Sequence, residues 1–294
     1  MAFNWETFRT RTLTAILFAA VMLTGLLWNQ WSFFILFSII HFGCWIEFQR
    51  LVEKIDPGYK TRTPVHQYGI MLVGWSLMFL FAAPFYRIGD MSFYHMGYWG
   101  GLILLALFLI SELFYIKGIR GKNFGHSIFG LVYISLSWGL MMALYRSFDA
   151  DLDTTEKILD PRVIPVTIVA AIWINDTMAY IVGSLIGKTP LTSISPKKTW
   201  EGTLGGIVLS VVVCGLLARF VFQFGKFTFH IMIIAAITAI MGTMGDLLES
   251  KLKRLAGVKD SGSMMPGHGG FLDRFDSMLL AIPFVWIYVT LFLK

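Results

Sequence analysis

Nine apolar stretches, each close to the length that crosses a bilayer, follow one another along the 294 residues. A helix needs about 20 apolar residues to span the hydrocarbon core, whereas a barrel strand alternates apolar and polar residues. The runs do not alternate, and 56% of all residues are hydrophobic. The sequence therefore predicts an all-α polytopic membrane protein with about nine transmembrane helices. The predicted spans lie near residues 12–28, 31–48, 68–85, 97–116, 124–145, 162–182, 201–221, 227–248 and 275–293.

The first span is expected to stay in the protein as a helix. A second span follows it at once, and no small-residue cleavage motif separates the two, as a removed signal peptide would require. No targeting extension is visible, which favours a bacterial cytoplasmic membrane over an organelle. Cys44 and Cys214 lie in different spans without metal-ligand spacing, so we expect two buried thiols.

Basic residues are distributed unevenly between the loops on the two sides of the predicted membrane. If the N-terminus and every second loop share one side, that side holds 17 of the 24 Lys and Arg residues. The opposite side holds an acidic loop around residues 149–160. Because Lys and Arg accumulate on the cytoplasmic side, we expect a cytoplasmic N-terminus and a C-terminus outside. Basic residues on this face also attract anionic lipid headgroups.

The nine spans fall into two regions of different composition. Residues 1–160, with spans one to five, are mostly apolar, and we expect them to serve as scaffold, lipid access and oligomer contact. Residues 161–294, with spans six to nine, contain both long basic loops, 183–200 and 249–274. The second region is therefore the expected catalytic region.

Four acidic residues lie within or near the ends of apolar runs. Glu47 and Glu112 are near predicted cytoplasmic ends, while Asp176 and Asp246 lie inside the sixth and eighth spans. A charged side chain at the bilayer centre costs about 2.5–3.5 kcal/mol on insertion scales, so such residues indicate a functional site. Both aspartates approach the cytoplasmic face in the expected topology.

The sixth span places Asp176 and Tyr180 on one helical face, together with Ala179. We expect the carboxylate and the phenol to face a polar cleft. The alternative is that Asp176 pairs with Asn175 or reaches the membrane interface.

The loop before the seventh span contains Ser195-Pro196-Lys197-Lys198. Ser195 suits an N-cap and Pro196 the first helical position, which predicts both lysines in the first turn of the helix. Cations beside exposed helix N–H groups bind phosphate well. Anchoring of the lysines at the membrane surface is the alternative, but it leaves the following Glu201 unexplained.

A G-x-x-x-G pattern, Gly202 to Gly206, opens the seventh span. This spacing is typical of close helix packing. We expect a packing contact here and no chemistry.

The densest charge lies in residues 250–276, called here the signature segment: S-K-L-K-R-L-A-G-V-K-D-S-G-S-M-M-P-G-H-G-G-F-L-D-R-F-D. Carboxylates hold divalent cations, Lys and Arg cover phosphate oxygens, and glycines let backbone N–H groups approach an anion. Asp273 and Asp276 stand one turn apart at the start of the ninth span, where helix capping alone would also favour carboxylates. Just upstream, four polar residues share one helical face: Asp246, Glu249, Ser250 and Lys253.

With these residues in view, the chain resembles the phosphatidate cytidylyltransferase (CDP-diacylglycerol synthase) family. The family signature contains S-x-φ-K-R, four residues and K-D, then a small residue, and later P-x-H-G-G-φ-x-D-R-φ-D, where φ is apolar. The residues of this chain that match it are Ser250, Lys253, Arg254, Lys259, Asp260, Gly262, Pro266, His268, Gly269, Gly270, Asp273, Arg274 and Asp276. The resemblance is strong over about 175–276 and general before that. It implies transfer of a cytidylyl group from CTP to phosphatidic acid, giving CDP-diacylglycerol and pyrophosphate with Mg²⁺, by a homodimeric membrane protein that needs no nucleic acid.

The resemblance also implies a metal site near the cytoplasmic surface, which we assign to Asp246 and Asp273. Asp276 would be a third ligand or would hold a ligand in place, and a second cation is compatible with these residues but not required. The catalytic candidates are Asp246, Lys259, His268, Asp273, Arg274 and Asp276. The substrate-binding candidates are Asp176, Tyr180, Ser195, Lys197, Lys198, Glu201, Glu249, Ser250, Lys253, Arg254, Asp260, Gly269 and Gly270.

Two other functions fit parts of the pattern. A CTP-dependent kinase acting on a polyprenol or another lipid alcohol would release CDP in place of pyrophosphate. A cation or proton transporter would use Asp176 and Asp246, but transport sites lie near the bilayer midplane, and these acids approach one face.

Overall fold

The computed structural model describes residues 5–115, 121–146, 148–152, 155–263 and 269–293, and the chain packs as two compact units. The first unit comprises residues 1–142 and 252–275, and the second comprises 143–251 and 276–294. The predicted division of roles at residue 160 concerns function and stays a prediction.

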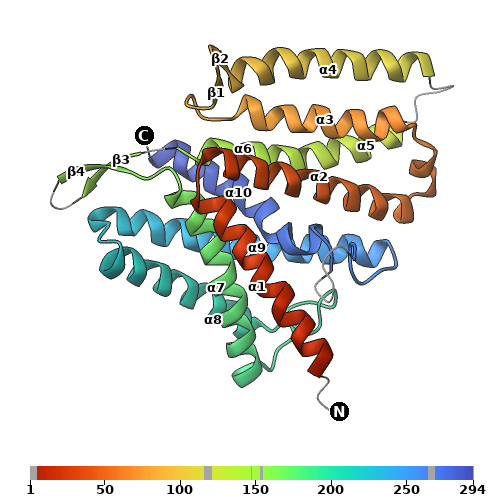
Figure 1. Ribbon diagram of the computed structural model, residues 1–294. Coiled ribbons are helices and arrows are strands. Elements are labelled where there is room, and N and C mark those ends of the chain that lie inside the picture. Colours follow the sequence, from red (N-terminus) through yellow and green to blue (C-terminus); the bar gives the residue numbers. More distant parts are fainter. Residues whose placement is uncertain (1–4, 116–120, 147, 153–154, 264–268, 294) are drawn as a thin grey trace. The chain divides into compact units, whose positions relative to one another are not determined.

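Helices occupy every region that the apolar runs predicted to span (Figure 1). Among the described residues, seven helices are long and apolar enough to cross a membrane. The two other predicted spans correspond to the first helix, with a shorter apolar stretch at Thr12–Leu27, and to the third, of 17 residues. The prediction of an all-α polytopic membrane protein is confirmed, while the orientation of the termini stays a prediction.

In chain order the helices of the N-terminal half are α1 (Trp5–Leu27), α2 (Gln30–Ile55), the 3₁₀ turn η1 (Pro57–Thr61), α3 (Pro64–Leu80), α4 (Phe93–Tyr115), α5 (Gly121–Gly130), the π-helical η2 (Leu131–Leu136) and α6 (Ser137–Leu144). They are followed by α7 (Val163–Ile186), α8 (Trp200–Leu216), the π-helical η3 (Leu217–Val221), the 3₁₀ turn η4 (Gly225–Phe227), α9 (Thr228–Leu255) and α10 (Leu272–Phe292).

Two antiparallel hairpins were not predicted. The first pairs β1 (Arg87–Ile88) with β2 (Met91–Ser92) through a turn in which Gly89 has φ of 59°. The second pairs β3 (Phe148–Leu152) with β4 (Thr155–Leu159) in the acidic loop. Residues 148–152 alternate apolar and acidic, F-D-A-D-L, so a period-two signal was present in the sequence.

Helix starts follow local capping chemistry. Asn29 and Ser32 form a capping box at the start of α2, with reciprocal side-chain to backbone hydrogen bonds of 2.9 and 3.1 Å. Thr63 caps α3 through the backbone N–H of His66 at 3.1 Å, and Pro64 occupies the first helical position. The loops between the apolar runs therefore contain the polar residues that begin the next helix.

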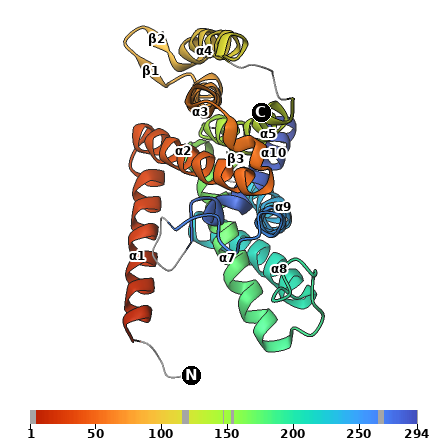
Figure 2. The same cartoon turned by 90° about the vertical axis from the view of Figure 1, so that its right-hand side faces the viewer.

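An aromatic core fills the first unit. Trp138 of α6 packs against Phe37 and Phe275, with ring centroids 5.1 and 5.7 Å away. Figures 1 and 2 show α3 and α4 lying side by side in this unit. Both cysteines are buried and free, as expected.

The π-helical segment η2 presents one polar side chain to this core. Ser135 accepts a hydrogen bond from Trp45 Nε1 at 2.8 Å and lies 2.9 Å from His41 Nε2. A π-helical turn shifts the register of the residues that follow, which brings the hydroxyl to α2. The histidine within the second span therefore has a packing and hydrogen-bonding role.

In the second unit, α7 and α8 pack closely along a glycine face (Figure 1). A Cβ atom at Gly206 would lie 2.8 Å from Ala179 Cβ and from the Asn175 carbonyl oxygen. One at Gly202 would lie 2.8 Å from the Ala179 carbonyl oxygen. The predicted packing role of the G-x-x-x-G pattern is confirmed, because only glycine fits at this distance.

We predict that Gly206→Leu destabilises the second unit by about 1–3 kcal/mol, because the side chain overpacks the contact between α7 and α8. Thermal unfolding in detergent should then occur at a clearly lower temperature. Gly100 of α4 is a matched control, since nothing lies within 4 Å of a Cβ added there. An equal loss in Gly206→Leu and Gly100→Leu would contradict the packing argument.

Candidate functional site

The loop before α8 differs from its prediction. The helix begins at Trp200, and its N-cap is Thr199, whose hydroxyl accepts from Gly202 N at 3.1 Å. The expected cap at Ser195 is wrong, because Ser195 to Lys198 form a turn closed by a hydrogen bond of 3.1 Å from Lys198 N to Ser195 O. Lys198 therefore precedes the helix and does not lie in its first turn.

Glu201 holds this loop to the end of α7. Its carboxylate accepts backbone N–H groups of Lys188 and Thr189 at 3.2 Å. A β-bridge between Pro190 and Thr199 joins the two ends of the loop. Glu201 thus has a structural use within the chain, and its assignment to substrate stays a prediction.

Asp176 and Tyr180 lie on the exposed surface of α7. Asn175 donates a hydrogen bond of 3.4 Å to Asp176 Oδ1, which is the local pairing that the sequence left open as an alternative. A role of either residue toward a ligand stays a prediction.

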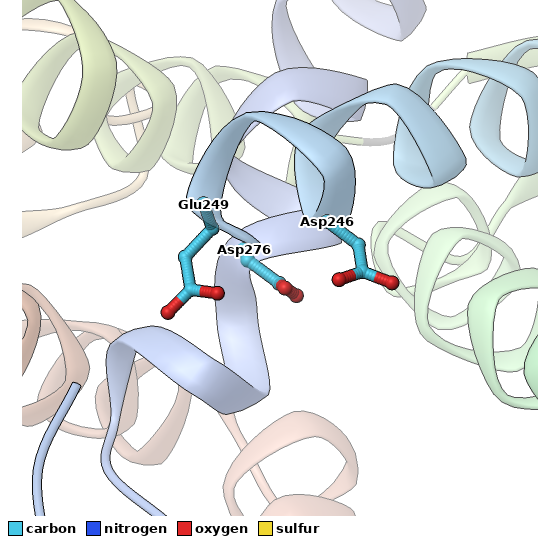
Figure 3. A group of neighbouring side chains, drawn as sticks. All are labelled: Asp246, Glu249 and Asp276. Atoms are coloured by element: carbon cyan, nitrogen blue, oxygen red, sulfur yellow. The ribbon is translucent and has the colours of Figure 1, made fainter. Parts of the chain in front are cut away.

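Three carboxylates meet at the contact between α9 and α10 in the second unit. Asp246, Glu249 and Asp276 each offer an oxygen atom, and these atoms lie within 4.8 Å of one another. Figure 3 shows the three side chains on the same side of α9, with Asp276 reaching in from α10. Glu249 is fully buried and Asp276 is 7% exposed. We call this group the carboxylate cluster.

Glycines bring the two helices together at this point. A Cβ atom at Gly245 would lie 2.5 Å from the Asp276 carbonyl oxygen, and one at Gly242 would lie 3.4 Å from Ser277 Cβ. The backbone of α10 can therefore approach α9 closely beside Asp246. In the sequence, Asp246 follows the contact residue Gly245 directly, so its carboxylate lies beside this helix contact.

Lys198 contributes a positive charge to the carboxylate cluster, because its ammonium group forms an ion pair with Asp246 Oδ2. Ser250, one turn further along α9, donates to Asp246 Oδ1 at 3.3 Å. Like charges at such short range raise the free energy of the ionised cluster, so a cation beside it is stabilising. The loop lysine supplies one unit of that charge.

In the first unit, a second set of polar contacts surrounds the carboxylate of Asp273. Lys253 Nζ lies 2.7 Å from Asp273 Oδ1, and the side chains are 13% and 8% exposed. Asp273 Oδ2 accepts the backbone N–H groups of Ser261 at 2.9 Å and of Gly270 at 2.8 Å. Gly269, at φ of 80°, makes the turn that allows this approach.

The remaining signature residues fall into two sets. Arg254, Lys259, Asp260 and Arg274 have exposed side chains, as does Lys197 in the loop before α8. His268 lies outside the described residues. These exposed cations place positive charge on the surface of the unit that carries them.

Comparison with known proteins places the chain in a family. The sequence model of the cytidylyltransferase family matches residues 9–292, nearly the whole chain. The chain belongs to the cytidylyltransferase family.

Curated relatives of this chain are named phosphatidate cytidylyltransferase. The protein of that name from Synechocystis sp. is 45% identical over 124 residues, 42% of each chain. The Bacillus subtilis protein is 45% identical over 122 residues, 41% of this chain and 45% of its own. Phosphatidate cytidylyltransferase 4, chloroplastic, of Arabidopsis thaliana is 44% identical over 120 residues, 41% of this chain and 30% of its own. The chain thus spans less than half the length of the curated relatives it matches.

Sequence reasoning missed two contributions to this family's candidate site. Glu249 was predicted to share a helical face with Asp246 but was assigned to substrate, whereas its carboxylate lies in the carboxylate cluster with Asp246 and Asp276. Ser261, which holds Asp273, carried no sequence signal beyond being a small residue. Asp273 was expected with Asp246 as a metal ligand; the structure gives it Lys253 and backbone partners, and its metal role stays a prediction.

We predict that Lys198→Met destabilises the protein by about 1–2 kcal/mol, because the carboxylate cluster loses its paired cation at a partly exposed position. Chemical unfolding in mixed micelles measures the change. Addition of Asp246→Asn should restore most of the loss, since one negative charge is then removed as well. The adjacent, exposed Lys197→Met is the control and should stay within about 0.5 kcal/mol of the wild type. Equal effects of the two lysine variants would exclude the ion pair as the cause.

Proposed function

We propose that the chain is a phosphatidate cytidylyltransferase, which transfers the cytidylyl group of CTP to phosphatidic acid and releases pyrophosphate. The observation that carries the proposal is the family match over residues 9–292, together with relatives of that printed name at 44–45% identity. Paired acidic and basic side chains in the signature segment support phosphate chemistry. Polyprenol kinase and transporter functions have no comparable support.

The acceptor in the proposed reaction needs little chemical activation, because the phosphate of phosphatidate is already ionised at neutral pH. Catalysis then consists of placing that oxygen in line with the α-phosphorus of CTP and neutralising the charge that develops. Lys259 and Arg274 are the proposed contacts of the triphosphate, and backbone N–H groups around Gly269 are further donors. Lys197 and Lys198 are proposed to cover a phosphate of either substrate.

Magnesium is the proposed cofactor, and the residues present fit it. Mg²⁺ prefers oxygen ligands and binds through one or two carboxylates together with substrate oxygens and waters. The carboxylate cluster offers three such oxygens within 4.8 Å, two of them on buried residues. Asp246 and Asp276 are the proposed ligands within this cluster, and Glu249 is a further candidate. When bound, the cation would supply charge neutralisation to the phosphates.

We also propose a bacterial cytoplasmic membrane, a site that faces the cytoplasm and a homodimeric assembly. The excess of Lys and Arg in the loops around the candidate residues supports the orientation. CTP would reach such a site from the cytoplasm, while phosphatidate would enter sideways from the inner leaflet with its acyl chains remaining in lipid.

The decisive experiment follows the products. Membranes that contain the protein, CTP, phosphatidate and Mg²⁺ should yield CDP-diacylglycerol and pyrophosphate in equal amounts. Asp246→Asn should lower the rate at least about 100-fold, because a preorganised charge at the reacting phosphates is lost. Asp160→Asn, an exposed aspartate paired with Arg162, is the control and should keep the wild-type rate. Release of CDP in place of pyrophosphate would identify a kinase, and ion flux without CTP turnover would identify a transporter.

Cation binding can be tested without turnover. We predict that MgCl₂ raises the unfolding temperature of the purified protein and that a chelator reverses the shift, because a ligand of the folded state stabilises it by mass action. Asp276→Asn should weaken the apparent Mg²⁺ affinity about 10-fold or more, whereas Asp160→Asn should leave it unchanged. An unaltered response in Asp276→Asn would remove the carboxylate cluster from consideration as the metal site.

A further inference from the structure

Glu47 of α2 is a buried carboxylate, 3% exposed, far in sequence from the signature segment. An ionisable group in the interior must have polar partners, because water no longer solvates it. Among the residues that the structure describes, the hydrogen-bond partners of Glu47 belong to the signature segment. They connect a residue of the expected scaffold region to the expected chemical region within the first unit.

One oxygen of Glu47 joins the two ends of the signature turn, the name used here for the described residues 262–263 and 269–271 between Ser261 and Leu272. Glu47 Oε2 accepts a hydrogen bond of 2.8 Å from Ser261 Oγ, before the turn, and one of 2.9 Å from Leu272 N, after it. The second donor is a backbone N–H in the first turn of α10, which has no partner within its own helix. The same carboxylate therefore caps a helix and fixes the loop that leads to it.

Glycines on both sides of the turn make room for this carboxylate. A Cβ atom added at Gly262 or at Gly270 would overlap the carboxylate oxygens of Glu47. The two glycines thus lie directly against the charged group. This contact requires glycine for space, independently of any ligand.

The hydroxyl of Ser261 lies between the carboxylates of Glu47 and Asp273. The hydroxyl lies 2.8 Å from Glu47 Oε2 and 2.9 Å from Asp273 Oδ2. The hydroxyl is within donating distance of both carboxylates, and Asp273 Oδ2 also accepts the backbone N–H groups of Ser261 and Gly270. The Lys253–Asp273 ion pair is consequently built on a turn that Glu47 holds in place.

The other buried glutamate of the first unit shows a different pattern. Glu112 is 2% exposed, and its carboxylate lies 3.1 Å from His66 Nδ1. His66 in turn lies 2.8 Å from Ser127 Oγ, so this group stays within the helices of the N-terminal half. Burial of a glutamate in this unit therefore does not by itself require a contact with the signature segment.

We propose that Glu47 is a positioning residue for the reaction, which acts by fixing the signature turn so that the side chains flanking it, Lys259 and Arg274, meet the triphosphate of CTP. The proposal rests on the proposed function. It assigns to the second helix a part in nucleotide binding, whereas the lipid substrate is not expected to depend on it.

Steady-state kinetics with matched variants tests the proposal. Glu47→Leu removes both acceptors and should raise the KM for CTP at least 10-fold while the KM for phosphatidate stays within two-fold. Glu47→Gln keeps an oxygen that can accept both hydrogen bonds, so its KM for CTP should stay within about three-fold of the wild type. Ser261→Ala removes only the hydroxyl and should give an intermediate rise.

Glu112→Leu is the control for loss of a buried carboxylate in the same unit, and it should leave both KM values unchanged. A merely structural role of Glu47 would reduce the amount of active enzyme and leave both KM values as they are. That result, or the same rise in the KM for CTP with Glu112→Leu, would overturn the proposal. If Glu47→Leu does not fold, the KM for CTP of Ser261→Ala is compared with that of Glu47→Gln. A KM in Ser261→Ala no higher than in Glu47→Gln would then overturn the proposal.

Hydrogen exchange separates this proposal from the proposed function. In Glu47→Leu without substrates, the amide of Leu272 should exchange at least 10-fold faster than in the wild type, and the amide of Ala171 in α7 should be unaffected. Faster exchange in a protein that makes no CDP-diacylglycerol would reject the proposed function and keep the turn contact. Unchanged exchange would reject the contact itself.

Discussion

Carboxylates buried among apolar helices are the constraint on which the candidate site depends. In an apolar interior an ionised carboxylate is stable only where cations, N–H groups or hydroxyls surround it. The acids in and around the signature segment have different partners of this kind. Glu47 has a hydroxyl and a helix N-terminus, Asp273 has a lysine and two backbone N–H groups, and the carboxylate cluster has Lys198 at its edge. The polar loops are therefore anchored by the acids, and the acids are stabilised by the loops.

Glycine is the second requirement, because these contacts need backbones at short range. Gly245 lets α10 approach α9 beside Asp246, and Gly262 and Gly270 leave space for the carboxylate of Glu47. Gly206 likewise lets α8 approach α7 closely, at a contact with Ala179 and Asn175 and no charged side chain. These glycines thus serve close packing, and Gly245 also lets Asp246 and Asp276 come near one another.

The helices could be predicted from the sequence because each apolar run is long enough to be read without knowledge of its neighbours. The start of α8 was misplaced, since Ser195 and Thr199 are both good caps and only the turn at residues 195–198 decides between them. Helical periodicity predicted that Glu249 and Asp246 share one face, but it did not predict that Asp276 of α10 lies beside both. The contact of Glu47 with Ser261 could not be predicted from the sequence, because the residues are 214 positions apart and nothing local in either segment indicates the other.

The lysines that pair with Asp246 and Asp273 are well suited to exchange partners in the proposed reaction. Lys198 is bound to Asp246 and Lys253 to Asp273, so each cation is already held near an anion before a substrate arrives. A lysine that turns from its aspartate to a phosphate oxygen leaves that carboxylate available to a cation, and the net charge of each group changes little. Such an exchange avoids the cost of leaving either charge buried alone. In the proposed reaction, such pairs would keep each carboxylate matched with a cation until a substrate phosphate and magnesium bind.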